Sequence, residues 1–409
     1  MYNLYMKKIF LKRVIGSEIL AAANEFPVVI LTGPRQTGKS TLLKMLFPDY
    51  TYITMDDPFA RKTAAEDPIL FLEKGGEKML IDEVQYIPGI LPYIKILVDK
   101  KRDQNGRFIL TGSQIFPLMQ GISESLAGRA AIYELLEFSY EEIHEVVKIN
   151  TTADFFEMIL RGFFPDPAVQ GVRFHNFFRS YIQSYIERDI RQVRSVQDLH
   201  TFQVFMELLA SRGGSLLNLN EVAKDCGISH TTAMNWLSLM ETTRIIYLLR
   251  PYFKNIGKRV IKSPKLYFTD TGLLAFLLKY PDAGILQAGP AAGAIFENFI
   301  IMEVLKYKLN HNLLVDLYFY RDSNHNEIDL VLDYGLHQKL FEIKSSRTLK
   351  TEFFSTLERI SPLFPQSECF LVSLSSEATF YKNSKAIPWH DLTGVITGGF
   401  NRLFPGREP

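Results

Sequence analysis

The sequence contains few cysteines and no long apolar run, and both absences limit what the protein can be. Only two cysteines occur among 409 residues, Cys226 and Cys369, which excludes a disulfide framework or a cysteine metal site and suits a reducing compartment. The apolar run from Thr271 to Leu278 is too short to cross a bilayer, and basic residues interrupt the N-terminal segment, which argues against a signal peptide. We therefore predict a soluble, cytoplasmic protein with no membrane contact.

An excess of one charge is also lacking. The sequence has 46 lysines and arginines against 45 acidic residues, and its formal net charge is +1. Global charge therefore favours neither a nucleic acid nor any other charged partner, and only local patches can do so. A hydrophobic fraction of 47% predicts a globular chain with an ample core, and the length suggests two or three domains.

One glycine-rich stretch organises the chain. Residues 31–41 read L-T-G-P-R-Q-T-G-K-S-T and fit the pattern G-x-x-x-x-G-K-[ST], between an apolar run typical of a buried strand and a helical pattern. An ordinary glycine-containing turn is the alternative. The residues that we expect to bind a nucleotide are Gly33, Pro34, Arg35, Gln36, Thr37, Gly38, Lys39, Ser40 and Thr41.

The residue types in this stretch suit a bound triphosphate. The two glycines let the backbone turn its N–H groups toward a phosphate, and the following helix directs its positive end at the same anion. Lys39 would reach the β- and γ-phosphate oxygens, and the Ser40 hydroxyl would hold Mg²⁺. We therefore predict ATP and Mg²⁺ as ligands.

Acidic and hydroxyl residues end two later apolar runs. Asp82 and Glu83 follow one run, and we expect Asp82 to help hold Mg²⁺ and Glu83 to orient the attacking water. Thr111, Ser113 and Gln114 follow the next run and are candidates for sensing the γ-phosphate. A solvated strand end is the alternative for the acids.

Two further local patterns carry predictions. Arg129 is either an arginine finger, acting in its own chain or a neighbouring subunit, or half of a structural ion pair. The apolar and basic spacing of residues 5 to 25 predicts a leading helix, and Asp57 before Pro58 predicts a helix N-cap.

The ordered set of these motifs resembles the AAA+ superfamily, and specifically a prokaryotic ATP-binding family with a C-terminal domain of unknown function. The motifs are G-P-R-Q-T-G-K-S, L-I-D-E-V-Q, L-T-G-S-Q and S-L-A-G-R, and the segments around 161–165 and 181–189 are similar as well. The resemblance implies ATP binding and an AAA-type sheet, without a defined cellular role. The aromatic-rich helical pattern that follows predicts a lid over the nucleotide.

A helix–turn–helix pattern at 220–236 and two apolar runs at 244–249 and 265–268 predict a winged helix. Short polar residues near the start of its second helix would meet base edges: His230, Thr231, Thr232 and Asn235. Basic residues in and around the wing would contact phosphates: Arg250, Lys254, Lys258, Arg259, Lys262 and Lys265. A structural or protein-binding winged helix is the alternative.

The C-terminal third holds a second constellation. Asp329 and Glu342 lie on apolar runs spaced for a hairpin, and Lys344 shares a strand face with Glu342. With Glu297 from a preceding helix, these residues resemble the PD-(D/E)XK nuclease family, which implies that the acids Glu297, Asp329 and Glu342 bind Mg²⁺ and that Glu342 and Lys344 take part in catalysis. A structural sheet with an exposed Glu–Lys pair is the alternative.

The predicted architecture is an α/β fold in four parts. Residues 1–140 form a P-loop AAA-type ATPase domain, 141–205 a helical lid, 206–280 a winged helix and 285–409 a restriction-endonuclease-like α/β domain. The predicted function is ATP binding and hydrolysis coupled to action on nucleic acid. The alternative is a nucleotide-dependent switch that binds a protein partner or a second copy, with a non-catalytic C-terminal domain.

The phosphate loop generates a direct prediction. Lys39→Ala removes the cation expected on the β- and γ-phosphates, so ATP hydrolysis should be abolished and nucleotide binding weakened, as measured by phosphate release and nucleotide titration. Unchanged turnover in this variant would contradict the assignment.

Overall fold

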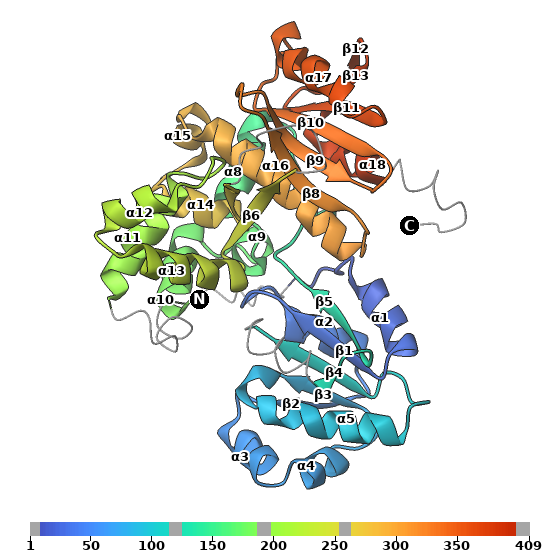
Figure 1. Ribbon diagram of the computed structural model, residues 1–409. Coiled ribbons are helices and arrows are strands. Elements are labelled where there is room, and N and C mark those ends of the chain that lie inside the picture. Colours follow the sequence, from blue (N-terminus) through green and yellow to red (C-terminus); the bar gives the residue numbers. More distant parts are fainter. Residues whose placement is uncertain (1–8, 114–124, 186–197, 253–262, 398–409) are drawn as a thin grey trace, which may run out of the picture. The chain divides into compact units, whose positions relative to one another are not determined.

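A computed structural model describes residues 9–113, 125–185, 198–252 and 263–397 (Figure 1). The chain forms two compact units. The first comprises Met1–Phe138 with the short segments Thr242–Ile245 and Leu309–Asn312, and the second comprises the remaining residues.

The first unit is built on a five-stranded sheet in the order β2-β3-β4-β1-β5, with every neighbouring pair parallel. The strands are β1 (Val28–Thr32), β2 (Thr51–Thr54), β3 (Met79–Asp82), β4 (Phe108–Gly112) and β5 (Ala130–Glu134). Strands β1, β3 and β4 are buried along their whole length. Their continuous apolar sequences agree with a parallel sheet that is covered on both faces.

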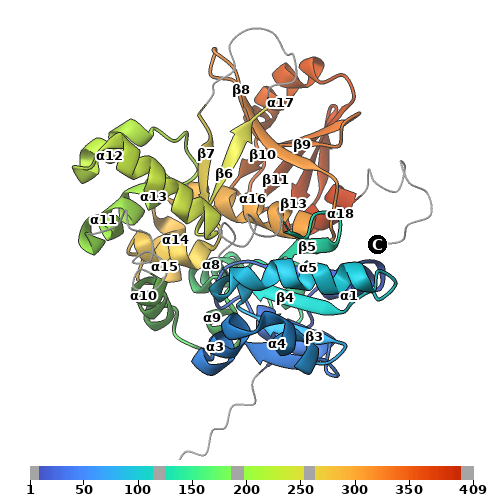
Figure 2. The same cartoon turned by 60° about the horizontal axis from the view of Figure 1, so that its bottom comes forward.

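Helices cover both faces of this sheet. They are α1 (Gly16–Glu25), α2 (Lys39–Leu46), α3 (Pro58–Glu66), α4 (Pro68–Lys74) and α5 (Leu91–Lys100), with short 3₁₀ turns at Val84–Tyr86 and Pro88–Ile90. Alternate residues of β1 point to opposite faces: Ile30 packs in the cluster that includes α5, and Val29 in the cluster that includes α1 and α2. Figure 2 shows α5 lying across the sheet.

The predicted leading helix begins later than expected. Helix α1 starts at Gly16, and the described residues before it are not helical. Arg13 is turned inward, where its guanidinium donates to the carbonyls of Thr37 and Leu136 at 2.9 Å each. The predicted N-cap at Asp57 is confirmed, because its Oδ1 accepts the backbone N–H of Phe59 at 2.9 Å.

The second unit contains an eight-stranded sheet in the order β12-β13-β11-β10-β9-β8-β6-β7. The strands are β6 (Ile246–Pro251), β7 (Lys265–Phe268), β8 (Asp316–Arg321), β9 (Glu327–Asp333), β10 (Gln338–Lys344), β11 (Ser367–Ser373), β12 (Thr379–Tyr381) and β13 (Ser384–Pro388). Arg250 of β6 pairs with Tyr318 of β8. The β6–β7 pair, expected as part of a separate winged helix, therefore extends the C-terminal sheet.

Helices precede, interrupt and follow these strands. They are α7 (Tyr140–Ile143), α8 (Thr152–Arg161), α9 (Pro165–Val169), α10 (Phe174–Tyr185), α11 (Leu199–Ala210), α12 (Leu219–Cys226), α13 (His230–Thr242), α14 (Thr271–Leu277), α15 (Ala283–Ala288), α16 (Ala292–Asn310), α17 (Ser355–Ile360) and α18 (Leu392–Thr397), with 3₁₀ turns at Thr351–Phe354, Ser361–Leu363 and Trp389–Asp391. Among the described residues, no helix is long and apolar enough to span a membrane.

Aromatic side chains join the first helices of this unit to its C-terminal part. The Phe155 ring of α8 lies 5.4 Å from that of Phe299 on α16 and 5.0 Å from that of Trp389, measured between ring centroids. All three side chains are buried. Helix α8, predicted to belong to a lid, thus packs within the same unit as the C-terminal sheet, and its predicted position over a nucleotide stays a prediction.

Asn298 of α16 provides a test of how this unit is held together. Its side chain is fully buried and bonds both backbone groups of Phe268, donating to the carbonyl and accepting from the N–H at 2.8 Å each. Asn298→Ala leaves both groups unpaired, so the free energy of unfolding should fall by about 2–4 kcal/mol in urea denaturation.

Asn24→Ala is the matched control. Asn24 is exposed and makes one hydrogen bond to its own helix, at 3.1 Å to the Leu20 carbonyl. We expect a change of about 0.5 kcal/mol or less. An equal fall in the free energy of unfolding in the two variants would contradict a stabilising role for the Asn298 hydrogen bonds.

Candidate functional site

The phosphate loop joins β1 to α2 through a backbone path that requires glycine. Gly33 has φ 139°, and a Cβ atom there would lie 2.1 Å from the Leu135 carbonyl oxygen. Gly38, at φ 91°, precedes the first residue of α2. These two conformations explain why the two glycines of the motif stand where they do.

Lys39 lies inside the curl of the loop. Its side chain is buried, and its ammonium donates to the carbonyls of Gly33 at 3.0 Å and Pro34 at 2.6 Å. Burial lowers the pKa of Lys39 to about 8, against the opposing pull of Glu83 and Asp82. The lysine therefore rests on weak backbone partners at the place where a phosphate would offer stronger ones.

Other residues of the loop have structural contacts. The Thr37 hydroxyl donates to the Pro34 carbonyl at 3.0 Å, and Arg35 donates to the Tyr86 hydroxyl at 3.3 Å. Gln36 and Thr41 are exposed. Arg13, which sequence reasoning missed, bonds the Thr37 carbonyl and lies 4.6 Å from the centroid of the Phe138 ring. In the sequence, the only indication of a structural role for Arg13 was a basic residue within a largely apolar segment.

Asp82 ends β3 and collects three hydroxyl groups. It accepts hydrogen bonds from Ser40 of the loop at 2.9 Å, from Tyr52 at 2.8 Å and from Thr111 at the end of β4. The pairing of Ser40 with Asp82 places a hydroxyl and a carboxylate oxygen together next to the phosphate loop. Oxygen donors of these kinds are those that Mg²⁺ prefers in proteins. The residues present therefore fit this ion.

Glu83 stands beside Asp82 in a left-handed conformation, with φ 56°. Its backbone N–H donates to the Thr111 hydroxyl at 3.1 Å, and its carboxylate accepts from Ser113 at 2.9 Å and from the Gln85 amide. A left-handed glutamate is uncommon and indicates a position set by its surroundings. The third sensor candidate, Gln114, lies outside the described residues.

Strand order explains why these residues meet. Strand β4 lies between β3 and β1, and all three run parallel. Their carboxyl ends therefore share one edge of the sheet, which carries the phosphate loop, the two acids and the two hydroxyl residues. The sequence-predicted ATP site is thus one contiguous place in the first unit.

Arg129 lies at the other edge. It precedes β5, and its carbonyl accepts the N–H of Val28, the first residue of β1. Its guanidinium forms a two-bond ion pair with Asp99 of α5, at 2.7 and 3.1 Å. The loop leaves the opposite end of β1, so within its own chain Arg129 lies away from the loop and forms the ion pair, while its predicted role as an arginine finger stays a prediction.

The predicted C-terminal residues come together on the second sheet. Strands β9 and β10 are antiparallel, with Leu330 paired to Phe341, so Asp329 and Glu342 are neighbours. The Lys344 ammonium lies 2.5 Å from Glu342 and 3.8 Å from Asp329. The expected proximity of these three residues is confirmed; their predicted chemistry stays a prediction.

Glu297 of α16 also lies near Asp329, and a lysine lies close to both acids. Lys265 of β7 lies 2.9 Å from Glu297, 2.5 Å from Glu327 and 3.6 Å from Asp329. Its side chain is only 3% exposed, so the prediction that Lys265 contacts nucleic-acid phosphates is wrong. Burial alone would lower the pKa of Lys265, but the surrounding carboxylates raise it above its ordinary value.

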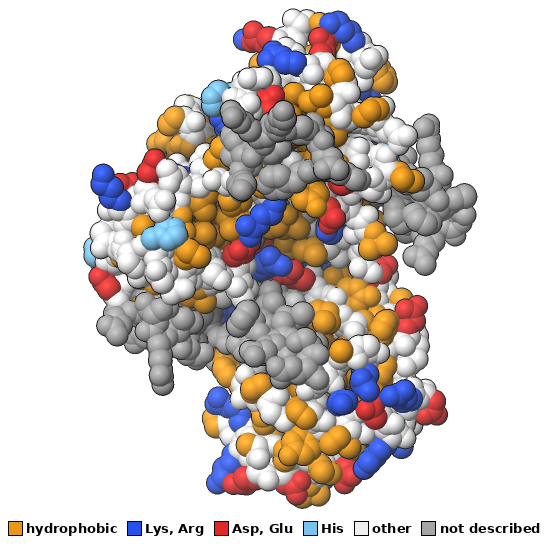
Figure 3. Space-filling view, viewed as in Figure 1, with side chains coloured by type: hydrophobic (Ala, Val, Ile, Leu, Met, Phe, Trp, Pro, Cys, Tyr) orange, Lys and Arg blue, Asp and Glu red, His pale blue; other side chains and the backbone are white. Residues whose placement is uncertain are grey.

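Helix α13 exposes several polar side chains in its first two turns. His230, Thr231 and Asn235 are exposed, whereas Thr232 bonds Ser229 at 2.9 Å. Of the predicted basic footprint, Arg250 pairs with Glu241 at 3.1 Å, and residues 254–262 lie outside the described chain. On the face shown in Figure 3, acidic and basic side chains are interspersed.

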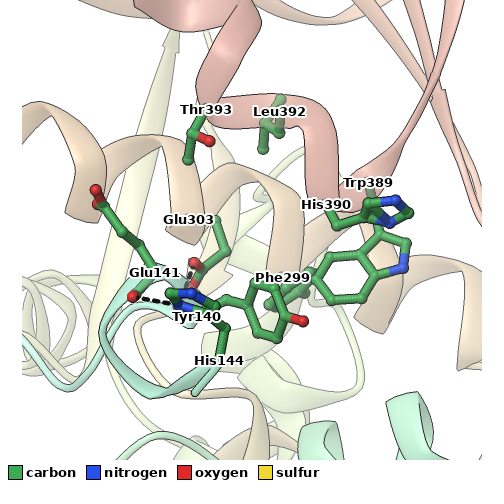
Figure 4. Close-up of a pocket in the computed structure, with 9 residues that line it drawn as sticks. All are labelled: Tyr140, Glu141, His144, Phe299, Glu303, Trp389, His390, Leu392 and Thr393. Atoms are coloured by element: carbon green, nitrogen blue, oxygen red, sulfur yellow. Dashed lines mark hydrogen bonds between the residues drawn. The ribbon is translucent and has the colours of Figure 1, made fainter. Parts of the chain in front are cut away.

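A pocket of about 180 Å³ lies elsewhere in the second unit (Figure 4). Tyr140, Phe299 and Trp389 form its aromatic wall, and Glu303, whose side chain is 10% exposed, accepts the Tyr140 N–H at 2.7 Å. Burial raises the pKa of Glu303. None of the residues predicted from the sequence to be functional lines it.

A phosphate loop and an acid-ended strand on a five-stranded parallel sheet define a P-loop ATPase domain. The family comparison agrees, because residues 25–144 match the model described as an AAA domain. Residues 152–283 match a domain of unknown function (DUF8612), and residues 292–392 match another (DUF4143).

Two mycobacterial proteins are similar over most of the chain. They are Uncharacterized protein Rv2008c of Mycobacterium tuberculosis and Uncharacterized protein Mb2031c of Mycobacterium bovis, each 33% identical over 342 residues, which is 82% of this chain and 74% of the relative. The chain belongs to the family of these two proteins. A solved Walker-type ATPase, PABY2304 of Pyrococcus abyssi, has 15% identity and a TM-score of 0.46, and covers 66% of this chain and 96% of that chain, too distant to inform function.

The lowered pKa of Lys39 predicts a pH effect on ATP binding. Bound phosphates favour the charged ammonium and so raise a pKa that is about 8 without them. Affinity should therefore be highest below pH 8 and fall up to about tenfold per pH unit above it, with proton uptake on binding.

Calorimetric titration at pH 8.5 in buffers of different ionisation enthalpy measures that uptake. Lys39→Arg is the control, because a guanidinium stays charged throughout this range. Equal pH dependence in the two proteins would contradict the role assigned to the Lys39 proton.

Proposed function

We propose that this protein is an ATP-hydrolysing molecular switch. One observation carries the proposal: Asp82 bonds Ser40 of the phosphate loop and Thr111 of β4, while Glu83 next to it bonds Ser113. The Ser40 hydroxyl thus links the loop to Asp82, and the Thr111 hydroxyl, which also accepts the Glu83 backbone N–H at 3.1 Å, links Asp82 to Glu83. A change at the loop, such as gain or loss of a phosphate, would be felt directly by the residues proposed to carry out hydrolysis.

The residues divide the work of hydrolysis in a simple way. The loop N–H groups and Lys39 hold the phosphates, with Lys39 leaving the Gly33 and Pro34 carbonyls to do so. Ser40 and Asp82 would hold Mg²⁺, which supplies positive charge against the phosphates when bound. Glu83 accepts a proton from, or orients, the attacking water. Ser113 fixes the direction of the Glu83 carboxylate.

Glu83→Gln tests this division. The amide keeps the size of the side chain but cannot act as a base, so turnover should fall by about 100-fold or more. ATP affinity should stay within a few-fold of the parent because the loop is untouched. Phosphate release and equilibrium binding of labelled ATP measure the two quantities.

Glu73→Gln is the control, since Glu73 is an exposed residue of α4 and belongs neither to the phosphate loop nor to the strand ends around it. It should turn over ATP like the parent. Full activity in Glu83→Gln would contradict the proposed catalytic role.

A second candidate function is nucleic-acid binding by the second unit. Helices α11–α13 followed by the antiparallel β6–β7 pair have the element order of a winged helix, and the first two turns of α13 expose His230, Thr231 and Asn235. Short polar side chains at that position suit base edges. The alternative, a protein partner at the same helix, is an outcome of the test below.

Asn235→Ala should weaken duplex DNA binding by about 1–3 kcal/mol if this helix contacts bases. Fluorescence anisotropy at several salt concentrations, with ATP or ADP present, measures the affinity and its salt dependence. Asn24→Ala in the first unit is the control. Binding that is absent, or equal in both variants, would favour the protein-binding alternative.

A further inference from the structure

The acids of the C-terminal sheet invite the question of whether they hold a metal. A divalent ion with oxygen ligands needs several carboxylate or carbonyl oxygens that face one open point. Among the residues described, no group of three or more histidine, cysteine or acidic side chains has an arrangement that could hold a metal ion. Glu297 and Asp329 nevertheless lie near one lysine, Lys265, and Glu342, the cross-strand neighbour of Asp329, pairs with a second lysine, Lys344.

Lys265 lies among three carboxylates. Its ammonium lies 2.9 Å from Glu297 and 2.5 Å from Glu327, and 3.6 Å from Asp329. The carboxylates come from α16 and β9, whereas the lysine comes from β7. A buried ammonium with three carboxylates around it takes the same place, relative to those oxygens, as a bound cation would.

The remaining lone pairs of the acids are also directed elsewhere. The oxygen of Glu297 that meets Lys265 accepts the Tyr267 hydroxyl at 2.6 Å. The Asp329 oxygen that does not face Lys265 accepts the backbone N–H of Ile343 at 2.8 Å. Arg321 holds the second Glu327 oxygen at 2.9 Å. These donors orient the carboxylates toward the lysine.

One carboxylate oxygen near these acids, on Glu342, lacks a hydrogen-bond donor among the described residues. Glu342 Oε2 is buried without a hydrogen-bond partner in the described part of the chain, while Oε1 accepts from Lys344. Such an atom can signal a missing ion. Here a cation already lies beside that carboxylate, because the Lys344 ammonium is 2.5 Å from Glu342 and 3.8 Å from Asp329.

We propose that Lys265 is a built-in cation that replaces a divalent metal at the centre of the C-terminal acidic cluster. The second unit then holds no metal at this place and does not cleave phosphodiester bonds. The cluster instead fastens β7 to α16 and β9, and so joins the β6–β7 pair to the C-terminal sheet through side chains as well as strand pairing.

The proposal implies a latent metal site. Four carboxylates, those of Glu297, Glu327, Asp329 and Glu342, are offset in this structure by Lys265, Lys344 and Arg321. Removing the Lys265 charge leaves acids without a cation at their centre and opens the space that its ammonium filled. Such a cavity lined by carboxylates suits Mg²⁺ or Mn²⁺.

Mn²⁺ binding to the full-length chain tests the proposal without relying on activity. Asp82→Asn serves as the parent, so that the nucleotide site contributes no metal. Electron paramagnetic resonance of free Mn²⁺ should show no bound ion in the parent and one bound ion per chain in the Lys265→Ala double variant. Mn²⁺ should also raise the thermal midpoint of that variant and leave the parent unchanged.

Three results would overturn the proposal. The first is Mn²⁺ bound by the parent and lost on Glu342→Gln. The second is a folded Lys265→Ala protein that binds no Mn²⁺. If the Lys265→Ala protein does not fold, Lys265→Met, whose side chain has a similar length, takes its place in the experiment. The third is cleavage of end-labelled single- or double-stranded DNA with Mg²⁺ or Mn²⁺ by the wild type that is lost in Glu342→Ala. ATP turnover is unaffected in every arm that retains Asp82, so failure here is distinct from failure of the ATPase.

Discussion

A buried carboxylate must find donors, and both units of this protein are arranged around that requirement. In the first unit Asp82 meets hydroxyl groups from Ser40, Tyr52 and Thr111. In the second unit Glu297 meets the ammonium of Lys265. Burial penalises an ionised acid in both places, and hydrogen bonding or an opposite charge offsets it. The difference between a hydroxyl and an ammonium decides what each site can do.

Hydroxyl donors leave the charge of Asp82 uncompensated. A neutral group stabilises the carboxylate by a hydrogen bond but leaves its attraction for cations intact, and the Ser40 hydroxyl can itself become a ligand. Such a site suits a metal that would bind and leave together with ATP. Lys39 can likewise exchange its present partners for a phosphate, because backbone carbonyls bind its ammonium more weakly than phosphate oxygens would.

An ammonium donor closes the other site. Lys265 satisfies the acids around it by charge as well as by hydrogen bonds, and its own burial is tolerable only because those acids surround it. If Lys265 moved away from the acids, or the acids from Lys265, the group that stayed behind would be a buried charge without a partner. The result is a permanent link between β7, α16 and β9, strengthened by the bonds of Asn298 to Phe268. A winged helix moving independently of the C-terminal sheet would have to break these contacts.

Sequence by itself determined the features that lie close together along the chain. The phosphate loop, the strand ending in Asp82 and Glu83, and the Asp57 cap follow from local conformational needs, and the spacing of Asp329, Glu342 and Lys344 followed from strand alternation. Tertiary structure alone decided the partners of distant charges. Strand order put Arg129 at the edge opposite the loop, and Arg13 turned inward to bond Thr37. The pairing of β6 with β8 brought Lys265 to acids far away in the sequence. Residue types and local spacing predicted the acids, but which cation lies among them depends on the packing of three separate elements.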